Sequence, residues 1–102
     1  MILDTVDSIN GVAIRLTEER WDHIVGRRPY MATHYEKVLD AVQNPSFILR
    51  GARGSLVAVL ALGRRRYLLV FYREVSKLDG FIITAYIDDA VDRSKIIWRA
   101  DR

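Results

Sequence analysis

The residues of this sequence that could do chemistry are a histidine and a set of arginines whose types suit a phosphodiester substrate. RNA is cleaved when its own 2′-hydroxyl attacks the adjacent phosphate, so a protein need supply only a base, an acid and cations that stabilise the charge on the phosphoryl oxygens. An imidazole gains and loses a proton near neutral pH. An arginine keeps its charge and holds a phosphate with two N–H groups.

His23 is the candidate for proton transfer, and two arginines follow it one turn later. It comes two residues after Trp21 on a predicted helix, which turns it away from the apolar stripe of that helix by roughly 100–200°. A ligand could reach it there; the alternative is a histidine that only bonds a backbone group or packs under a loop. Arg27 and Arg28 lie just before Pro29. They either bind phosphate or interact with the dipole at the helix end.

Further candidates lie on strands of the second half of the chain. In the triplet Arg64–Arg66, alternation along a strand puts Arg65 on one face and its two neighbours on the other, so the whole triplet cannot serve one site. It can equally be a solvated turn. Arg73 lies at the far end of the same strand. Thr84 and Tyr86 share one face of a later strand: Thr84 is either a strand former or a hydroxyl on the floor of a cleft, and Tyr86 either stacks on a base or covers the core.

Length and composition predict one ordinary globular domain over residues 1–102. Hydrophobic residues make up 50% and charged residues 28% of the chain, which is not the balance of a disordered protein. No apolar run approaches the roughly 20 residues that span a bilayer, and the N-terminus lacks a signal-peptide pattern. The sequence has no cysteine, which excludes disulfides and thiolate metal sites. We therefore expect a cytoplasmic protein without a membrane partner.

Positive charge is concentrated in the middle of the chain. The net charge is only +3, but residues 27–66 hold eight basic residues against two acidic ones, whereas residues 67–102 hold six of each. A local excess of this kind favours an anionic partner such as nucleic acid. It also fits a solvated basic edge that keeps the protein in solution.

The motifs of several other chemistries are missing. There is no Gly-rich phosphate loop, and His23 and His34 lack the spacing of a zinc site. Asp88, Asp89 and Asp92 cluster after the last clear strand but have no Gly-centred calcium loop around them. We expect neither a metal nor a cofactor.

Two helices are predicted in the first half of the chain. Thr17 is a candidate N-cap for the first helix, which ends before Pro29. The second begins near Thr33, where Thr33-x-x-Glu36 resembles a capping box, and Asn44-Pro45 ends it. Each helix carries an apolar stripe at helical spacing: Trp21, Ile24 and Val25 in the first, and Tyr35, Val38, Leu39 and Val42 in the second.

The second half of the chain has the alternating, branched and aromatic pattern of strands. Strands are predicted at 47–50, 55–62, 66–73 and 81–87, with Asp79-Gly80 as a hairpin turn. Residues 11–16 form a short first strand, residues 1–10 are loosely held, and residues 94–99 form either an edge strand or a short helix. Short connections predict antiparallel pairing. The fold class is therefore α+β, with two N-terminal helices on an antiparallel sheet of about four strands.

The strongest predicted strand is apolar on both of its faces. Leu68, Val70 and Tyr72 point one way, and the residues that point the other way are Tyr67, Leu69, Phe71 and Arg73. One face must pack against the helices. The other is then a surface for a partner or the floor of a cleft.

Four short motifs, in this order and spacing, resemble the phage-associated branch of the barnase–EndoU–colicin–RelE superfamily of nucleases. Together they cover roughly two thirds of the chain. They are Trp21-x-His23-Ile24, Arg27-Arg28-Pro29-Tyr30-Met31, Asn44-Pro45 followed by Ile48, and the strand pair Tyr67-Leu68-Leu69-Val70 and Ile82-Ile83-Thr84-Ala85-Tyr86. The family's fold of helices followed by an antiparallel sheet agrees with the fold expected above.

The resemblance implies metal-independent cleavage of RNA, or descent from an enzyme that does this. It assigns the family's helix histidine to His23, its strand hydroxyl to Thr84, and its basic sheet residues to Arg66 and Arg73. The family's second motif usually reads His-Pro-Glu, whereas this chain reads Arg28-Pro29-Tyr30. At that position the chain can bind or stabilise a phosphate but cannot transfer a proton.

Three hypotheses follow. In the first, the protein is a ribonuclease or a toxin-like relative: His23 is the general acid or base, Arg28 and Arg73 stabilise the phosphate, and Thr84 orients it. The residues that would hold the RNA are Arg27, Arg65, Arg66 and Tyr86. In the second, it is a non-catalytic module that binds RNA or a protein such as an antitoxin, or that forms a homodimer through its apolar second face. In the third, it is an accessory domain without a site.

Overall fold

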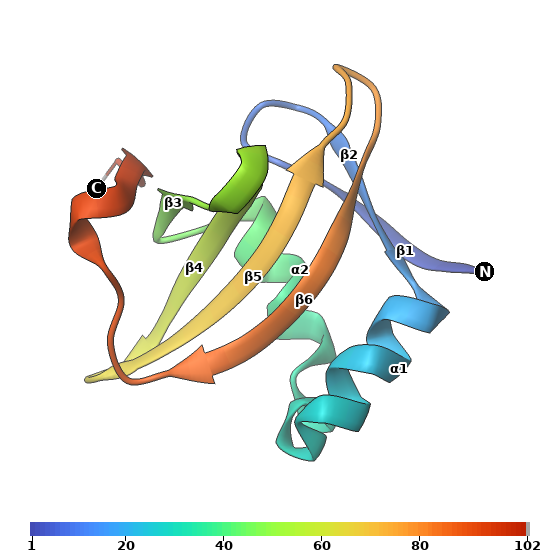
Figure 1. Cartoon of the computed structure of the whole chain (residues 1–102), viewed down its shortest axis with the longest axis horizontal. Helices are drawn as coiled ribbons and strands as arrows, with labels where there is room; N and C mark the ends of the chain where they lie inside the picture. The colour runs from blue at the N-terminus through green and yellow to red at the C-terminus, as the bar shows by residue number, and fades with distance from the viewer. Residues whose placement is uncertain (102) are drawn as a thin grey trace.

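The computed structural model describes residues 1–101, which form an α+β fold of two helices and a seven-stranded mixed sheet (Figure 1). The helices are α1 (Glu18–Arg27) and α2 (Tyr35–Gln43). The strands are β1 (Ile2–Asp7), β2 (Ala13–Thr17), β3 (Phe47–Arg50), β4 (Leu56–Gly63), β5 (Arg66–Glu74), β6 (Gly80–Asp88) and β7 (Ile96–Arg99). Three short 3-10 turns connect them: η1 (Pro29–Thr33), η2 (Ala52–Gly54) and η3 (Arg93–Lys95).

The sheet order is β1-β2-β6-β5-β4-β3-β7. The four strands predicted from the second half of the sequence pair antiparallel as expected, from β3 through β6. The prediction of a four-stranded antiparallel sheet is nevertheless wrong. The N-terminal hairpin adds two strands, β2 pairs with β6 in parallel, and β7 adds an edge beside β3.

The first ten residues are not loosely held, contrary to the expectation from their polarity. β1 pairs antiparallel with β2, and the turn between them is closed by Ser8, whose backbone carbonyl accepts from Gly11 N. Gly11 has φ +75°, a conformation that glycine adopts without a Cβ clash. β1 is an exposed edge strand, so it lacks the alternation of buried and exposed residues by which a strand is usually found.

One predicted helix cap is present and the other is not. Thr17 Oγ1 accepts a hydrogen bond from Arg20 N at 3.1 Å, which confirms the N-cap of α1. The capping box at Thr33 and Glu36 is wrong, because Thr33 ends the η1 turn and α2 begins only at Tyr35, after His34. Residues 94–99 combine both expected forms, a 3-10 turn followed by the edge strand β7.

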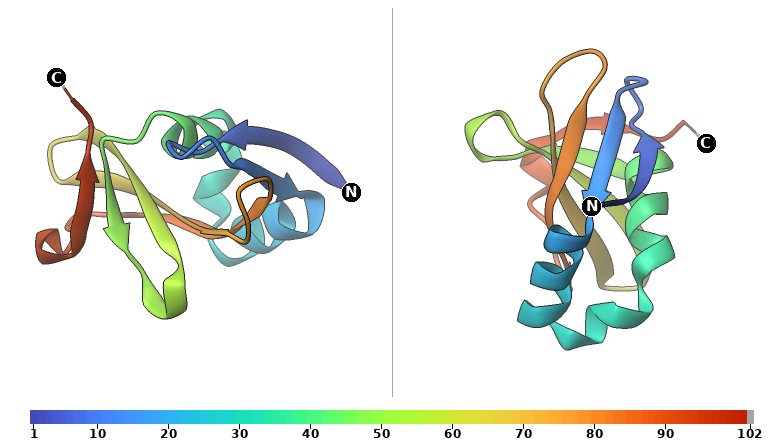
Figure 2. Two further views of the ribbon diagram at one scale, coloured as in Figure 1. Left: turned by 90° about the horizontal axis from the view of Figure 1, so that it is seen from above. Right: turned by 90° about the vertical axis from the view of Figure 1, so that its right-hand side faces the viewer.

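Both helices contribute to a core on one face of the sheet, as the sequence predicted (Figure 2). Ile24 of α1 and Val38 and Val42 of α2 are buried against Leu68 and Val70. The core also contains Tyr72, which is fully buried. Burial raises the pKa of its hydroxyl above the usual range for tyrosine. Figure 2 shows α2 and the η2 turn on opposite sides of the sheet.

The parallel contact between β2 and β6 depends on a glycine. Gly80 pairs with Ile14, and a Cβ at this position would lie 2.4 Å from the carbonyl oxygen of Arg73 and 2.6 Å from Cδ1 of Ile14. Because α1 follows β2 directly, this contact also fixes where α1 lies relative to β6. Any side chain at position 80 must therefore push β6 away from the backbone of β5 and from Ile14 of β2.

We expect Gly80→Ala to lower the free energy of unfolding by about 1–3 kcal/mol, the usual cost of inserting a carbon into a close-packed region. The matched control is Gly26→Ala in α1, where a Cβ meets nothing within 4 Å. That substitution should stabilise the protein by about 0.5–1 kcal/mol, because alanine favours a helix interior over glycine. Urea unfolding measures both. Equal effects of the two substitutions would contradict the role given to Gly80.

Candidate functional site

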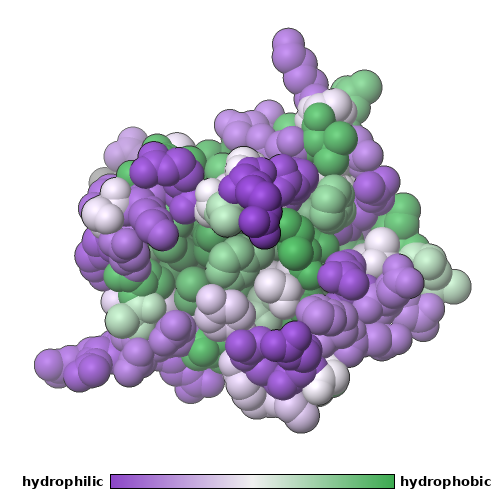
Figure 3. Space-filling model, in the orientation of Figure 1, coloured by the Kyte–Doolittle hydropathy of each residue, from purple (hydrophilic) through white to green (hydrophobic). Residues whose placement is uncertain are grey.

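The second face of the sheet, defined here as the face turned away from α2, carries an apolar floor (Figures 1 and 3). Its buried members are Phe47, Leu49, Val57, Val59 and Leu69, with Tyr67, Phe71 and Tyr86 partly buried around them. Figure 3 views this face and shows a hollowed apolar centre with hydrophilic residues around it. The prediction that Tyr67, Leu69, Phe71 and Arg73 share a face opposite Leu68, Val70 and Tyr72 is confirmed.

The segment that follows β6 crosses part of this face. Val91 and Ile96 pack onto the floor, and Arg93 donates from Nη2 to the Tyr67 hydroxyl at 3.1 Å. The guanidinium of Arg93 also lies 5.4 Å from the ring centroid of Phe47. Hydrogen bonds from Ser94 lower the pKa of Asp92, which keeps this carboxylate charged. The segment therefore reaches β5 at Tyr67. Farther along β5 and β6, Phe71, Thr84 and Tyr86 stay partly exposed, and this is the open part of the floor.

An arginine and two aromatic rings form a stack on the open part of the floor. The guanidinium carbon of Arg28, at the end of α1, lies 4.5 Å from the ring centroid of Tyr86. Tyr86 stacks in turn on Phe71, with 5.5 Å between the centroids and 28° between the ring planes. The face of an aromatic ring attracts a cation, so Tyr86 holds Arg28 at the sheet while the outer part of the guanidinium stays available to an anion.

Thr84 lies next to this stack. It pairs across the strands with Phe71, and residues directly opposite in a sheet share a face. Arg73 is two residues further along β5 and donates from Nη1 to the carbonyl oxygen of Arg53 at 2.7 Å. That bond ties the η2 turn, in which Arg53 has φ 53°, to the second face. The structure therefore brings Arg28, Tyr86, Thr84 and Arg73 onto one surface.

Within residues 1–101, His23 makes no hydrogen bond or ion pair with that surface. Arg20, three residues earlier on α1, donates to the carbonyl oxygen of Ile83 at 3.4 Å, and Arg28 covers Tyr86. Both arginines thus reach β6 from α1, and His23 lies between them in the helix. Its side chain is half-buried. A helical residue three positions after Arg20 is on the same side of the helix, so His23 lies on the side of α1 from which Arg20 reaches β6.

The other predicted RNA contacts do not join this surface. Arg66 lines a hollow on the helix side of the sheet with His34 and Lys37, because it alternates with Tyr67 along β5. Arg65 has φ 56° in the β4–β5 turn and lies 3.9 Å from a carboxylate oxygen of Asp89, with both side chains exposed. Such exposed ion pairs contribute little. Arg27 is exposed at the end of α1.

Tyr30, in the η1 turn after α1, has a structural role. The Tyr30 hydroxyl accepts a hydrogen bond from the backbone N–H of Ile87 at 3.0 Å. This bond joins the η1 turn to β6 at the level of Tyr86, and so helps to hold the end of α1 where Arg28 meets the ring. Tyr30 therefore positions the end of α1 relative to β6.

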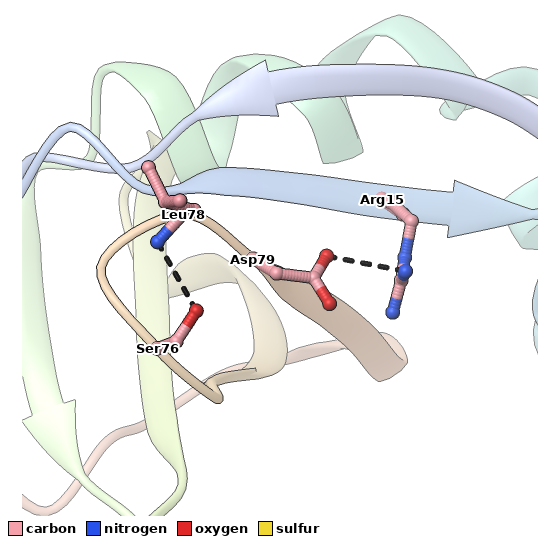
Figure 4. Close-up of polar contacts among 4 residues, drawn as sticks. All are labelled: Arg15, Ser76, Leu78 and Asp79. Carbon is pink, nitrogen blue, oxygen red and sulfur yellow. Dashed lines mark hydrogen bonds and ion pairs between the residues drawn. The ribbon is translucent and has the colours of Figure 1, made fainter.

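A shallow hollow of about 370 Å³ lies at the other end of β6. Phe81 and Ile83 line it together with Arg15, Thr17 and Arg20. Strict alternation along β6 would place Phe81 on the face opposite Thr84, but a bulge between Phe71 and Tyr72 in the pairing with β6 shifts the register. Phe81 pairs with Arg73 and so lies on the second face. Figure 4 shows Arg15 at this end held by Asp79 at 3.1 Å, beside a turn in which Ser76 accepts from Leu78 N at 3.2 Å.

A second hollow, of about 380 Å³, adjoins the stacked rings. Leu69, Phe71 and Tyr86 form part of its lining, with Arg50 and Lys95 at its borders. Within residues 1–101 no group of three or more His, Cys, Asp or Glu side chains is arranged to hold a metal ion. No helix in that range is long and apolar enough to cross a membrane.

Comparison with protein-family models, with curated proteins and with solved structures found no match. The assignment of a function to this chain therefore rests on the geometry and chemistry of the second face.

Replacing the hydroxyl of Tyr30 tests whether it positions the site. Tyr30→Phe should lower the free energy of unfolding by about 0.5–1.5 kcal/mol, the net value of one hydrogen bond, and should speed amide exchange at Ile87. The control is Tyr86→Phe, which keeps the stacked ring and removes only its hydroxyl. If Tyr30→Phe leaves exchange at Ile87 unchanged, the bond does not hold η1 to β6.

Proposed function

We propose that the protein binds single-stranded RNA on the second face of its sheet and cleaves it without a metal ion, as a small ribonuclease or a toxin-like relative of one. The observation that carries this proposal is the stack of Arg28, Tyr86 and Phe71 on an open sheet face. Unpaired bases are recognised in proteins by stacking on exposed aromatic rings, with arginines along the backbone.

Positive charge around the floor supports an anionic ligand. Arg28 and Arg20 border the floor from α1, and Arg73 borders it from β5. Thr84 lies among them, opposite Phe71, where its hydroxyl can donate to a phosphoryl oxygen. A phosphate above Thr84 would lie on the same face as Arg73 and the stacked rings.

The place of His23 supports cleavage in addition to binding. It lies on α1 between two arginines that both contact β6. An imidazole on that side can take a proton from a 2′-hydroxyl or give one to the leaving 5′-oxygen, while the arginines stabilise the charge on the phosphoryl oxygens. Cleavage by the 2′-hydroxyl would leave a cyclic phosphate on one product and a 5′-hydroxyl on the other.

A non-catalytic RNA-binding module is the second candidate, and the chemistry of Tyr30 favours it. The hydroxyl at position 30 is engaged with the backbone of Ile87, and Arg28 cannot transfer a proton. Only His23 then remains on this side of the site as a proton donor or acceptor. The RNA-binding surface is the same in both candidates, and they differ in whether bound RNA is cut.

RNA binding is tested by two substitutions that remove the same charge from opposite faces of the sheet. Arg28→Gln should weaken binding of a single-stranded RNA and reduce the slope of log affinity against log salt by about 0.7, the value of one phosphate contact on a single strand. Arg66→Gln, on the helix side, should change both by less than half as much. Fluorescence anisotropy over a range of salt concentrations measures them, and equal effects would place the RNA elsewhere.

Cleavage is tested on the same RNA in the presence of EDTA. The wild-type protein should produce ends with a 2′,3′-cyclic phosphate, and His23→Gln should reduce the rate by about 100-fold or more, the usual contribution of a general acid or base. His34→Gln is the matched control, since His34 contacts Thr33 and Tyr30 at the η1 turn. Binding without cleavage by the wild-type protein would select the non-catalytic candidate.

A further inference from the structure

The two hollows on the second face lie on opposite sides of Thr84. Along β6, Phe81 and Ile83 line one hollow, and Tyr86 and Asp88 line the other. Thr84 falls between these pairs and belongs to neither lining. Phe81 and Tyr86 pair with Arg73 and Leu69, which are four positions apart on β5. At the rise of an extended chain this separation corresponds to about 13 Å.

The two hollows are lined by similar kinds of side chains. Each has an aromatic ring in its lining, Phe81 in one and Phe71 beside Tyr86 in the other. Each also has two cationic side chains in its lining, which are Arg15 and Arg20 at the first hollow, and Arg50 and Lys95 at the second. Arg15 is paired with Asp79, and the second hollow is lined by Asp88 and Asp92 as well. At about 370 and 380 Å³, both are at the lower end of the size range of small-molecule sites.

We infer that the two hollows are separate base-binding subsites and that the phosphate backbone passes between them over Thr84. This inference rests on the proposed function and adds that the ligand is an oligonucleotide with at least two bases turned into the sheet face. The cations at each border are placed for the phosphates that flank each base. Thr84 and Arg73 are placed for the phosphate that joins the two halves of the ligand.

A flat nucleobase fits the two hollows better than a peptide does. The linings offer aromatic and aliphatic faces for a ring to stack on. A peptide would add to a sheet through an edge strand. β5 is paired along its length with β4 and β6, whereas β2 pairs with β6 only at Gly80 and Phe81. Beyond those two residues, α1 and η1 border the edge of β6, where Arg20 and Tyr30 bond its backbone at Ile83 and Ile87. A peptide strand added there would have to displace both of these contacts, whereas a base that stacks on the side chains of the second face leaves them in place.

The test compares a ladder of single-stranded RNAs of one, two, four and eight nucleotides, with binding to the full chain measured by NMR titration or calorimetry at one salt concentration. Affinity should rise steeply once the RNA is long enough to fill both hollows and then level off. Two matched substitutions each replace one aromatic ring by an aliphatic side chain, so that the lining stays apolar. They are Phe81→Leu in the first hollow and Phe71→Leu in the second. Leu78→Ala, on the exposed hairpin tip, is the control.

Phe81→Leu should weaken binding of the eight-nucleotide RNA by at least about five-fold, the lower end of the value of one base stacked on an aromatic ring. It should leave the affinity of a mononucleotide unchanged, because a single nucleotide occupies the hollow beside Phe71 and Tyr86, where two rings are stacked. Phe71→Leu should weaken both ligands. Leu78→Ala should weaken neither.

The outcomes separate this inference from the proposed function. If the eight-nucleotide RNA binds, Phe71→Leu weakens it and Phe81→Leu does not, then the second face binds RNA through one subsite, so the inference of two is wrong. An affinity that does not depend on length would also contradict it. If no RNA of any length binds the wild-type protein, the proposed function fails and the two subsites fail with it.

Discussion

The structure depends on one constraint, which is that β5 and β6 carry apolar side chains on both of their faces. Leu68, Val70 and Tyr72 are fully buried under the helices. That face therefore forms the core and is not accessible to a ligand. The opposite face has too much apolar surface to lie open in water, and the segment after β6 covers only part of it with Val91 and Ile96. What remains uncovered is a strip of rings and aliphatic side chains with cations along its borders, and a ligand with flat apolar groups and negative charge satisfies both features.

The position of the cations follows from the edge of the sheet on which the N-terminal hairpin is added. β2 pairs with β6 in parallel next to Gly80, and because α1 starts immediately after β2, the helix must run beside β6. Arg20 then reaches the backbone of β6 near one end of the open strip, and Arg28 reaches Tyr86 near the other. The η1 turn, tied to Ile87 through Tyr30, fixes the second of these contacts. The pairing of β2 with β6 thus places Arg20 and Arg28, which are separate in the sequence, along one side of the open strip.

The sequence predicted what depends on local periodicity and could not predict what depends on long-range pairing. The strand from Arg66 to Glu74 and the faces of its residues follow from alternation, and the N-cap at Thr17 follows from the acids after it. The parallel β2–β6 contact leaves no local signal, so the seven-stranded sheet was missed. In the candidate site, the shared face of Thr84, Tyr86 and Arg73 was predictable, whereas the bulge that turns Phe81 to that face was not. The Arg20 contact carried a signal, since Arg20 and His23 are three residues apart on one helix, but Arg20 was overlooked.

The most direct test of the central claim is a residue-by-residue map of the surface that contacts RNA, obtained by titrating the isotope-labelled protein with a single-stranded RNA and following its amide signals. The account predicts that the signals that move belong to β5 and β6 around Phe71, Thr84 and Tyr86 and to the end of α1 at Arg28, while those around Lys37 and Arg66 on the helix side stay in place. Shifts confined to the helix side or to the β4–β5 turn at Arg64–Arg66 would contradict it, since the RNA would then follow positive charge alone and not the open face of the sheet.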